Sequence, residues 1–294
     1  TVIDLKIEPP SAKERDKLSA ALHKLSLEDP SFRVHFDDET EETVISGMGE
    51  LHLDIIVDRL KTEHKVEVKV GQPAVAFREA ITLEAESNYK FKKQTGGKGQ
   101  FAHIEMRIEP NPGQGLEFLN HIKGGSIPKE FIPAIEKGFR ASMEKGPYSG
   151  YPMVDVKFVL LDGSFHAVDS SEQAFKTCAQ LAIKEAIKKA APHVLEPMMK
   201  IEVNTPDEYM GEIIGDINRR RGRVDSMRRY RKGSQKVNGA IPLKEMFGYA
   251  SVLRTVSSGR ASHSIEFLQY FPLPKSIEEK LLADLRAKKA AEKK

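Results

Sequence analysis

Apolar residues alternate with polar ones at the start of the chain and then switch to a helical spacing. Residues 2–7 alternate as in a β-strand, and Pro9 and Pro10 end that pattern. Ser11 and Glu14 then have the spacing of a capping box at a helix start. Apolar residues follow at intervals of three and four in two stripes, which are Leu18, Ala21, Leu22 and Leu25, and then Leu53, Ile56, Val57 and Leu60. Strand-like segments at 32–36, 43–46 and 66–70 complete the predicted order βαββαβ.

The same order of elements returns near the other end of the chain. A strand is predicted over 199–203, and Thr205 with Glu208 forms a second capping box that places Pro206 at the first helical position. Two helical stripes are Met210, Ile213, Ile214 and Ile217, and then Leu243, Met246, Phe247 and Ala250. Strands over 223–227 and 236–241 flank a basic turn, and a last strand spans 262–268. Both ends therefore predict a ferredoxin-like module, an architecture that by itself implies no function.

Between the modules the pattern predicts a β-hairpin with a glycine-rich tip. Tyr89 and Phe91 alternate with lysines, the tip spans 95–99, and apolar residues alternate again over 102–108. A helix over 129–145, a strand over 154–160 and a second long helix follow. Asp169 and Glu172 form a third capping box before that helix, whose one face carries Phe175, Cys178, Ala182 and Ala186. Cys178 is therefore predicted to be a core residue.

Length and composition favour two or three globular domains. The chain has 294 residues, and domains of roughly 150 residues are typical. One cysteine excludes a disulfide framework and a zinc site built on paired thiolates, and it suits a reducing cytosol. No apolar run reaches the roughly 18 residues of a membrane-spanning helix. The chain begins at Thr1 directly on a strand pattern, so we expect a fragment cut at a domain boundary.

Charge is divided unevenly along the chain, although the net charge is only +3. Residues 219–236 contain nine basic residues against Asp225 alone, whereas residues 28–58 contain ten acidic residues against Arg33 alone. A basic segment in an otherwise acidic chain is typical of contact with a phosphate backbone, because each cation that neutralises a phosphate releases counterions. The alternative is a solvated loop, and charge alone leaves both interpretations open.

Candidate chemistry is sparse. Lys98 lies in the glycine-rich tip, but the spacing of a Walker loop and its Ser or Thr are missing, so we expect no nucleotide site. His166 lies in a polar loop directly before a helix N-terminus, a position that favours phosphates. A Ser, a His and an Asp fall within 164–169, but the members of a catalytic triad normally come from separate elements. Three other histidines lack the spacing of metal ligands and are predicted to be surface or packing residues, namely His52, His103 and His121.

Seven short motifs occur in one order over essentially the whole chain. They are GMGELHLDIIVDRL (47–60), TGGKGQ (95–100), IKGG (122–125), HAVDSSE (166–172), IGDINRRRG (214–222), EMFGY (245–249) and SGRAS (258–262). Together they resemble bacterial translation elongation factor G. The resemblance implies domains III, IV and V of that factor, without its GTPase domain and its β-barrel domain II.

The resemblance and the repeated pattern predict an α+β protein in which two ferredoxin-like βαββαβ modules flank an elongated α/β domain. In the family this middle domain has a left-handed βαβ crossover. We expect domain III at 1–76, domain IV at 77–196 and domain V at 197–270. A C-terminal helix and tail are expected at 271–294, where helical spacing relates Ile277, Leu281, Leu282 and Leu285.

The family couples GTP hydrolysis to movement of the tRNA–mRNA complex through the ribosome, so the resemblance implies a cytoplasmic, ribosome-binding protein. The tip of domain IV enters the decoding region of the small subunit, which implies RNA contacts by Gly96, Gly97, Lys98, Gly99, Gln100, His166 and Asp169. Domain V lies against the sarcin–ricin loop and the stalk base of the large subunit, which implies contacts by Gly215, Asp216, Arg219, Arg220 and Arg221. No catalytic residue, metal or cofactor is expected in this chain, because GTP and Mg belong to the GTPase domain of the intact factor.

Two departures from the family pattern leave the task within the family open. Ala167 follows the tip histidine where many members carry an acid, and residues 228–232 read RRYRK where the domain V hairpin is usually less basic. The alternatives are a paralogue specialised for ribosome recycling and a stand-alone RNA-binding protein.

Overall fold

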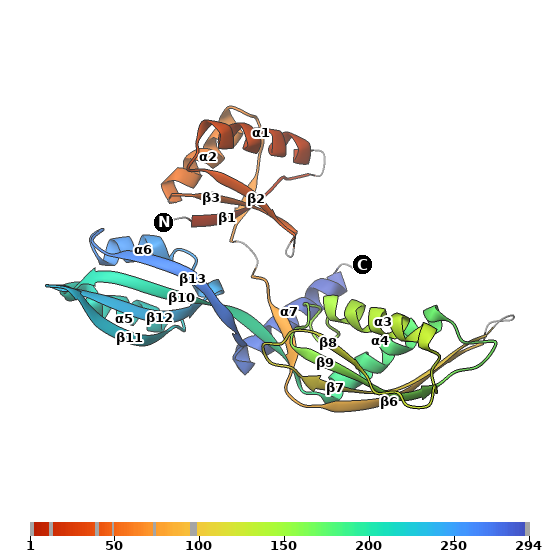
Figure 1. The fold of residues 1–294 in the computed structure, drawn as a ribbon. Coiled ribbons are helices and arrows are strands. Elements are labelled where there is room, and N and C mark those ends of the chain that lie inside the picture. The colour runs from red at the N-terminus through yellow and green to blue at the C-terminus, as the bar shows by residue number, and fades with distance from the viewer. Residues whose placement is uncertain are drawn as a thin grey trace. The chain divides into compact units, whose positions relative to one another are not determined.

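Two units can be distinguished along the computed structural model, which describes residues 3–11, 14–38, 41–48, 50–72, 75–94 and 99–291 (Figure 1). One unit comprises Thr1–Ala76 and Glu196–Tyr270, and the other comprises Phe77–Leu195 and Phe271–Lys294. Strand β10 (Pro192–Pro206) leads from the second unit into the first, and strand β13 (Ser262–Pro272) leads back.

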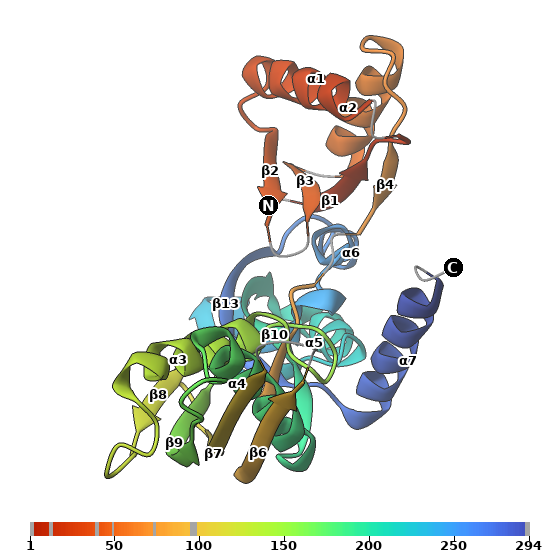
Figure 2. The same cartoon turned by 90° about the vertical axis from the view of Figure 1, so that its right-hand side faces the viewer.

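The N-terminal module has the predicted order βαββαβ. Its elements are β1 (Ile3–Glu8), α1 (Arg15–Glu28), β2 (Arg33–Asp37), β3 (Glu42–Gly47), α2 (Glu50–Thr62) and β4 (Lys69–Gly71). The strands form an antiparallel sheet in the order β2-β3-β1-β4, and both helices lie on one side of it (Figures 1 and 2). The apolar stripe of α1 and most of that of α2 are buried in one cluster, which confirms both predicted helix faces. Removal of these faces from water holds the helices on the sheet.

The C-terminal module repeats this topology. Its elements are β10, α5 (Met210–Arg219), β11 (Arg223–Arg231), β12 (Ser234–Pro242), α6 (Tyr249–Val256) and β13. The order β11-β12-β10-β13 is the order of the first module, with β11 and β13 at the edges. Ile213 and Ile217 of α5 share one buried cluster with Tyr249 and Leu253 of α6, so both helices pack on the same face of the sheet. The predicted pair of ferredoxin-like modules is therefore confirmed.

The second helix of this module begins later than its stripe predicts. Leu243–Glu245 forms a 3₁₀ turn, and Gly248 has a left-handed φ of 71°, which interrupts the helix before α6 begins at Tyr249. The buried residues of α6 are Tyr249 and Leu253, so the stripe from Leu243 to Ala250 is wrong as a helix face. Met246 is also buried, but it follows the 3₁₀ turn and lies outside the helix.

The three predicted capping boxes are wrong. Helix α1 begins at Arg15 behind Glu14, which makes no side-chain capping bond. Pro206 is the last residue of β10 and precedes a 3₁₀ turn over Asp207–Tyr209, so it is not the first residue of α5. Helix α4 (Glu172–Lys189) is capped by Ser171, whose hydroxyl accepts the N–H of Ala174, and not by Asp169. Spacing alone cannot identify a cap, because the chain direction before the helix decides which side chain faces the free N–H groups.

The middle domain is built on a four-stranded sheet of order β6-β7-β9-β8, which Figure 2 shows with the strands side by side. Its strands are β6 (Ala85–Lys93), β7 (Gln100–Pro110), β8 (Glu117–Asn120) and β9 (Val156–Ser164). The antiparallel pair β6–β7 is the predicted hairpin. β8 and β9 are parallel neighbours connected through α3 (Ile132–Glu144), which gives a βαβ crossover. Together with the two modules this establishes the predicted α+β fold.

Helices α3 and α4 pack closely on each other and share the buried cluster of the middle domain with the sheet strands. A Cβ at Gly138 of α3 would stand 2.7 Å from the carbonyl oxygen of Lys176 in α4, so only glycine allows this approach. A short strand, β5 (Arg78–Ile81), pairs with the first residues of β10.

A buried carboxylate fixes the loop between α3 and β9. Glu79 of β5 has no exposed surface, and its Oε1 accepts hydrogen bonds from the N–H of Ser149 (2.6 Å), the Ser149 hydroxyl (2.6 Å) and the N–H of Gly150 (2.8 Å). A Cβ at Gly146 would stand within 2.3 Å of the carboxylate carbon, so this glycine makes room for it. Buried charge is tolerated here because each hydrogen bond is charge-assisted.

The predicted C-terminal helix is α7 (Lys275–Ala291), and residues 292–294 lie outside the described residues. Its Glu278 carboxylate accepts the N–H of Val194 at 2.7 Å, which joins α7 to the start of β10 within one unit. Among the described residues, no helix has the length and apolar character needed to cross a membrane.

We expect the thiol of Cys178 to be unreactive in the folded middle domain. The residue is fully buried on α4, as predicted, and burial raises the pKa of its thiol to about 12. Thiolate is the reactive species, so labelling by a disulfide reagent at pH 8 should occur only through unfolding. The measurement compares labelling rates with and without urea, and rapid labelling without urea would contradict the buried position. Since this is the only cysteine of the chain, the rate reports on the middle domain alone.

Candidate nucleic-acid interface

The end of the β6–β7 hairpin is one of two regions that the sequence singles out. Lys93 pairs with Gln100 at the last described rung of the ladder. Gly99 and Gln100 are both partly buried, whereas the predicted contact residues Gly96, Gly97 and Lys98 lie outside the described residues. The structure therefore describes the base of the glycine-rich tip.

The loop 165–171 is hydrogen-bonded to the start of β7. The N–H of Phe101 donates to the carbonyl oxygen of Asp169 (2.8 Å), and the hydroxyl of Ser170 donates to the carbonyl oxygen of Phe101 (2.8 Å). The same hydroxyl accepts the N–H of His166 at 2.9 Å. The loop that carries His166 and the hairpin that carries Gln100 therefore form one connected surface. Ser170 was not predicted as a site residue, although it lies inside the motif HAVDSSE.

Hydrogen bonds within the loop determine which nitrogen of His166 faces outward. Its Nδ1 atom accepts the N–H groups of Val168 (3.3 Å) and Asp169 (3.2 Å), so in the neutral ring the proton is on Nε2. The Asp169 carboxylate lies 3.5 Å from Nδ1. The His166 side chain is 56% exposed, which leaves Nε2–H available as a donor to a ligand.

Asp169 has a packing role that its sequence position does not reveal. A Cβ at Gly99 would stand 3.1 Å from the Asp169 carboxylate, so this glycine lets the hairpin approach the loop closely. The carboxylate therefore lies between the two parts of the tip, and its neighbours are Gly99 and His166. Asp169 is placed to organise this surface as well as to face a ligand.

The second region is the end of α5, where three consecutive arginines have different surroundings. The side chain of Arg219 is 77% exposed and forms an ion pair with Asp216 at 3.4 Å. Arg220 is only 15% exposed, bonds to the Asp216 carboxylate at 2.8 Å and lies 5.2 Å from the ring centroid of Tyr249. Its guanidinium also donates to the carbonyl oxygens of Glu245 (2.6 Å) and Phe247 (3.2 Å). Arg220 therefore ties α5 to the segment before α6.

Arg221 is also engaged inside the module. Its guanidinium donates two bonds of 2.9 Å to the buried carboxylate of Glu196 and one of 3.1 Å to Glu245. Gly215 is exposed on α5, and a Cβ there would contact nothing within 4 Å. Of the predicted contact residues in this module, Arg219 and Gly215 are the ones that face solvent.

Most of the remaining basic residues lie in the edge strand β11, which continues to Arg231 and so shortens the predicted basic turn. Lys232 lies in the turn, and Lys236 lies in β12. β11 extends from Arg223 to Arg231, and the turn that follows is short, with Gly233 at a φ of 80°. Within the part of the chain that the structure describes, the side chains of Arg228 and Arg229 have no ion pair.

The predicted packing role of two histidines is supported by their bonds. His52 bonds to the Asp29 carboxylate at 2.7 Å and accepts the N–H of Met48. His103 is hydrogen-bonded to Ser164 and Asn88, and burial lowers its pKa. In the described ranges no group of three or more His, Cys, Asp or Glu side chains could hold a metal ion.

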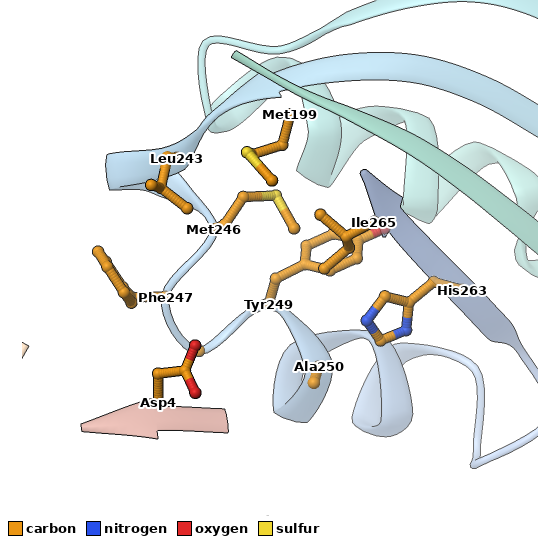
Figure 3. A pocket seen from close by; sticks show the side chains of 10 residues that line it. Asp4, Met199, Leu243, Met246, Phe247, Tyr249, Ala250, His263 and Ile265 are labelled. Atoms are coloured by element: carbon orange, nitrogen blue, oxygen red, sulfur yellow. The ribbon is translucent and has the colours of Figure 1, made fainter. Parts of the chain in front are cut away.

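A pocket of the C-terminal module lies between β10, β13 and the start of α6 (Figure 3). Its lining in this module is mainly apolar, with Met199, Met246, Tyr249 and Ile265. His263 meets the Tyr249 ring edge-on at 5.4 Å, and burial lowers the pKa of this histidine. The lining also contains the Asp4 carboxylate, which accepts the hydroxyl of Ser46, and the Tyr249 hydroxyl, which has no hydrogen-bond partner among the described residues.

Models of elongation factor G domains match the chain in three consecutive segments. Domain III matches residues 1–72, domain IV residues 73–191 and the C-terminus residues 193–281. A crystal structure of a protein from Thermus thermophilus is similar, with a TM-score of 0.86 and 34% sequence identity over 97% of this chain. This chain spans 43% of that one. The chain belongs to the elongation factor G family, with its C-terminal domains in the family's order.

We expect Arg220→Ala to destabilise the C-terminal module and Arg219→Ala to leave its stability nearly unchanged. Loss of Arg220 removes charge-assisted bonds and leaves the Asp216 carboxylate poorly compensated, which should cost about 2 kcal/mol. An exposed ion pair such as that of Arg219 contributes less than about 1 kcal/mol. Native-state hydrogen exchange of the α5 and β12 amides isolates this module. Equal effects of the two substitutions would contradict the division of roles.

Proposed function

We propose that this chain is the ribosome-binding effector part of a translational GTPase that promotes tRNA–mRNA translocation. GTP and Mg would be bound by a GTPase domain outside the described chain, and the protein would act in the cytoplasm. The observation that carries the proposal is the connected surface of the domain IV tip. A loop bonded to a β-strand and to its own histidine can hold a donor in a fixed direction against an RNA backbone.

The tip residues would act by shape and hydrogen bonding. Gly96, Gly97, Lys98, Gly99 and Gln100 on the hairpin, with His166 and Asp169 on the loop, would face the tRNA–mRNA duplex in the decoding region. The outward Nε2–H of His166 supports this role, because a phosphate oxygen accepts such a donor readily. A bond-breaking role is disfavoured by the same geometry, since Nδ1 is already occupied by two backbone N–H groups.

The C-terminal module would contact the sarcin–ricin loop and the stalk-base RNA of the large subunit through the end of α5. Among Gly215, Asp216, Arg219, Arg220 and Arg221, we assign direct phosphate contact to Arg219 and close backbone approach to Gly215. Arg220 and Arg221 would hold the helix end in position through Asp216 and Glu196, to which they bond.

A second candidate within the family is a factor specialised for ribosome recycling. Ala167 is exposed at the tip beside His166, and an acid at that position would change the charge facing the RNA. The neutral Ala167 is therefore consistent with a tip that contacts a different partner from that of family members with an acid at this position.

In an intact factor we expect His166→Ala to slow tRNA–mRNA movement about tenfold, the cost of about one charge-assisted hydrogen bond. The amide of His166→Gln can place an N–H donor near the Nε2 position, whereas the shorter side chain of His166→Asn reaches only the Nδ1 position. Movement should therefore be largely restored by Gln and not by Asn. Rapid kinetics of translocation beside GTP turnover makes the comparison, and GTP hydrolysis should stay nearly unchanged.

Two outcomes would change this assignment. Equal loss of GTP hydrolysis and movement would indicate a folding or docking defect and not a tip that acts on RNA. A factor specialised for recycling would already be weak in translocation, and His166→Ala would impair its subunit splitting instead.

We expect Arg219→Ala to flatten the salt dependence of ribosome binding by this chain. One lost phosphate contact reduces the slope of log affinity against log salt by about 0.7 to 0.9. Arg254→Ala on α6, an exposed arginine of the same module, is the matched control. Binding measured at several salt concentrations decides the question. A slope equal to that of the parent chain would show that Arg219 is only solvated.

A further inference from the structure

The hairpin formed by β11, its turn and β12 is strongly positively charged. Its cations are not among the residues of α5 for which we proposed RNA contacts. Between Ser226 and Asn238 the sequence contains five cations and no carboxylate. An aromatic residue, Tyr230, lies among these cations and is itself 48% exposed. Edge protection against strand pairing explains the charges but gives no reason for an exposed ring.

A β-bulge determines where these side chains point. Arg228 pairs with Lys236 and Arg231 pairs with Ser234, and the register shifts between Arg229 and Arg231. Ser234 and Lys236 are two residues apart, so they lie on the same face of the sheet. Their partners Arg231 and Arg228 therefore share that face, although they are three residues apart on β11. In an unbulged strand they would lie on opposite faces.

Tyr230 is the extra residue of this bulge, and two cations lie close to its ring. The guanidinium carbon of Arg231 is 5.1 Å from the ring centroid, and the Nζ atom of Lys236 is 5.2 Å from it. Both distances are within the range of cation–π attraction. Lys236 also pairs with Glu202 at 2.8 Å, whereas Arg228 has no ion pair among the described side chains. The bulge thus gathers an aromatic ring and three cations at one place.

A ring surrounded by cations fits an unpaired nucleotide better than a paired one. The backbone of a duplex offers phosphates to the cations but no base face to the ring. An unpaired nucleotide offers both, because its base stacks on an aromatic side chain while its phosphates meet Lys or Arg. Stacking would also cover the apolar ring surface that is now exposed to water.

We infer that Tyr230 is a stacking platform for an unpaired RNA base, with Arg228 and Arg231 on the neighbouring phosphates. The inference rests on the proposed RNA-facing role of this module, but it does not require translocation. It assigns to the hairpin a ligand chemistry that differs from the phosphate contact proposed for Arg219.

The test measures binding of the full chain to two fluorescent RNA probes by anisotropy. One probe is a single-stranded oligoadenylate of twelve nucleotides, and the other is a blunt twelve-base-pair RNA duplex. Tyr230→Ala should weaken binding of the single strand about tenfold, while Tyr230→Phe should retain it, because the phenyl ring still stacks. Neither change should alter the salt slope, whereas Arg228→Ala should lower the slope by about 0.7. Duplex affinity should not respond to Tyr230→Ala.

Three results would overturn the inference. They are the absence of single-strand binding by the parent chain, no loss with Tyr230→Ala, and an equal loss on both probes. Thermal unfolding of each variant provides the folding control, since exposed Tyr230 contributes little to stability. Ribosome binding by the same variants keeps the two proposals apart. A chain that binds the single strand through Tyr230 but does not bind ribosomes would refute the proposed function and leave this inference standing.

Discussion

The packing of helices on a single face of each sheet is the constraint on which the rest of this structure depends. In each ferredoxin-like module, and in the middle domain, one apolar cluster holds residues of both helices and of the central strands. Burial of those residues removes apolar surface from water, and most of the apolar stripe of each helix lies in this core. Strand ends, edge strands and helix ends are left outside the core. The candidate contacts with RNA lie in those places.

Positive charge in the C-terminal module has two physical roles. Arg220 and Arg221 form short bonds to Asp216, Glu196 and backbone carbonyls, so their charge is compensated inside the module. Arg219 and Arg228 remain largely unneutralised, and a guanidinium in that condition gains most from a phosphate. The internal bonds of Arg220 and Arg221 hold the end of α5 in place, so the exposed Arg219 beside them can meet a phosphate without a rearrangement of the helix.

In the middle domain, hydrogen bonds to the backbone hold the candidate contact residue His166 in place. The loop 165–171 bonds to β7 and to the ring of His166, so the direction of the imidazole is set before any ligand arrives. Because the loop is already ordered, binding to RNA would cost little conformational entropy. Such a loop can act as a rigid contact, which is the role that the proposed function needs.

The sequence by itself determined the repeated modules, the hairpin of the middle domain and the burial of Cys178. Those features follow from local periodicity, since a stripe such as that of α1 has only one apolar side to bury. The tertiary structure alone decided which of three adjacent arginines stays exposed, because Glu196, Glu245 and Phe247 approach the other two from distant parts of the chain. It also decided that Ser171 and not Asp169 caps α4, and that a bulge brings Arg228 and Arg231 to one face. Spacing in sequence carries no information about chain direction or about partners far away, and these properties set the chemistry of the surface.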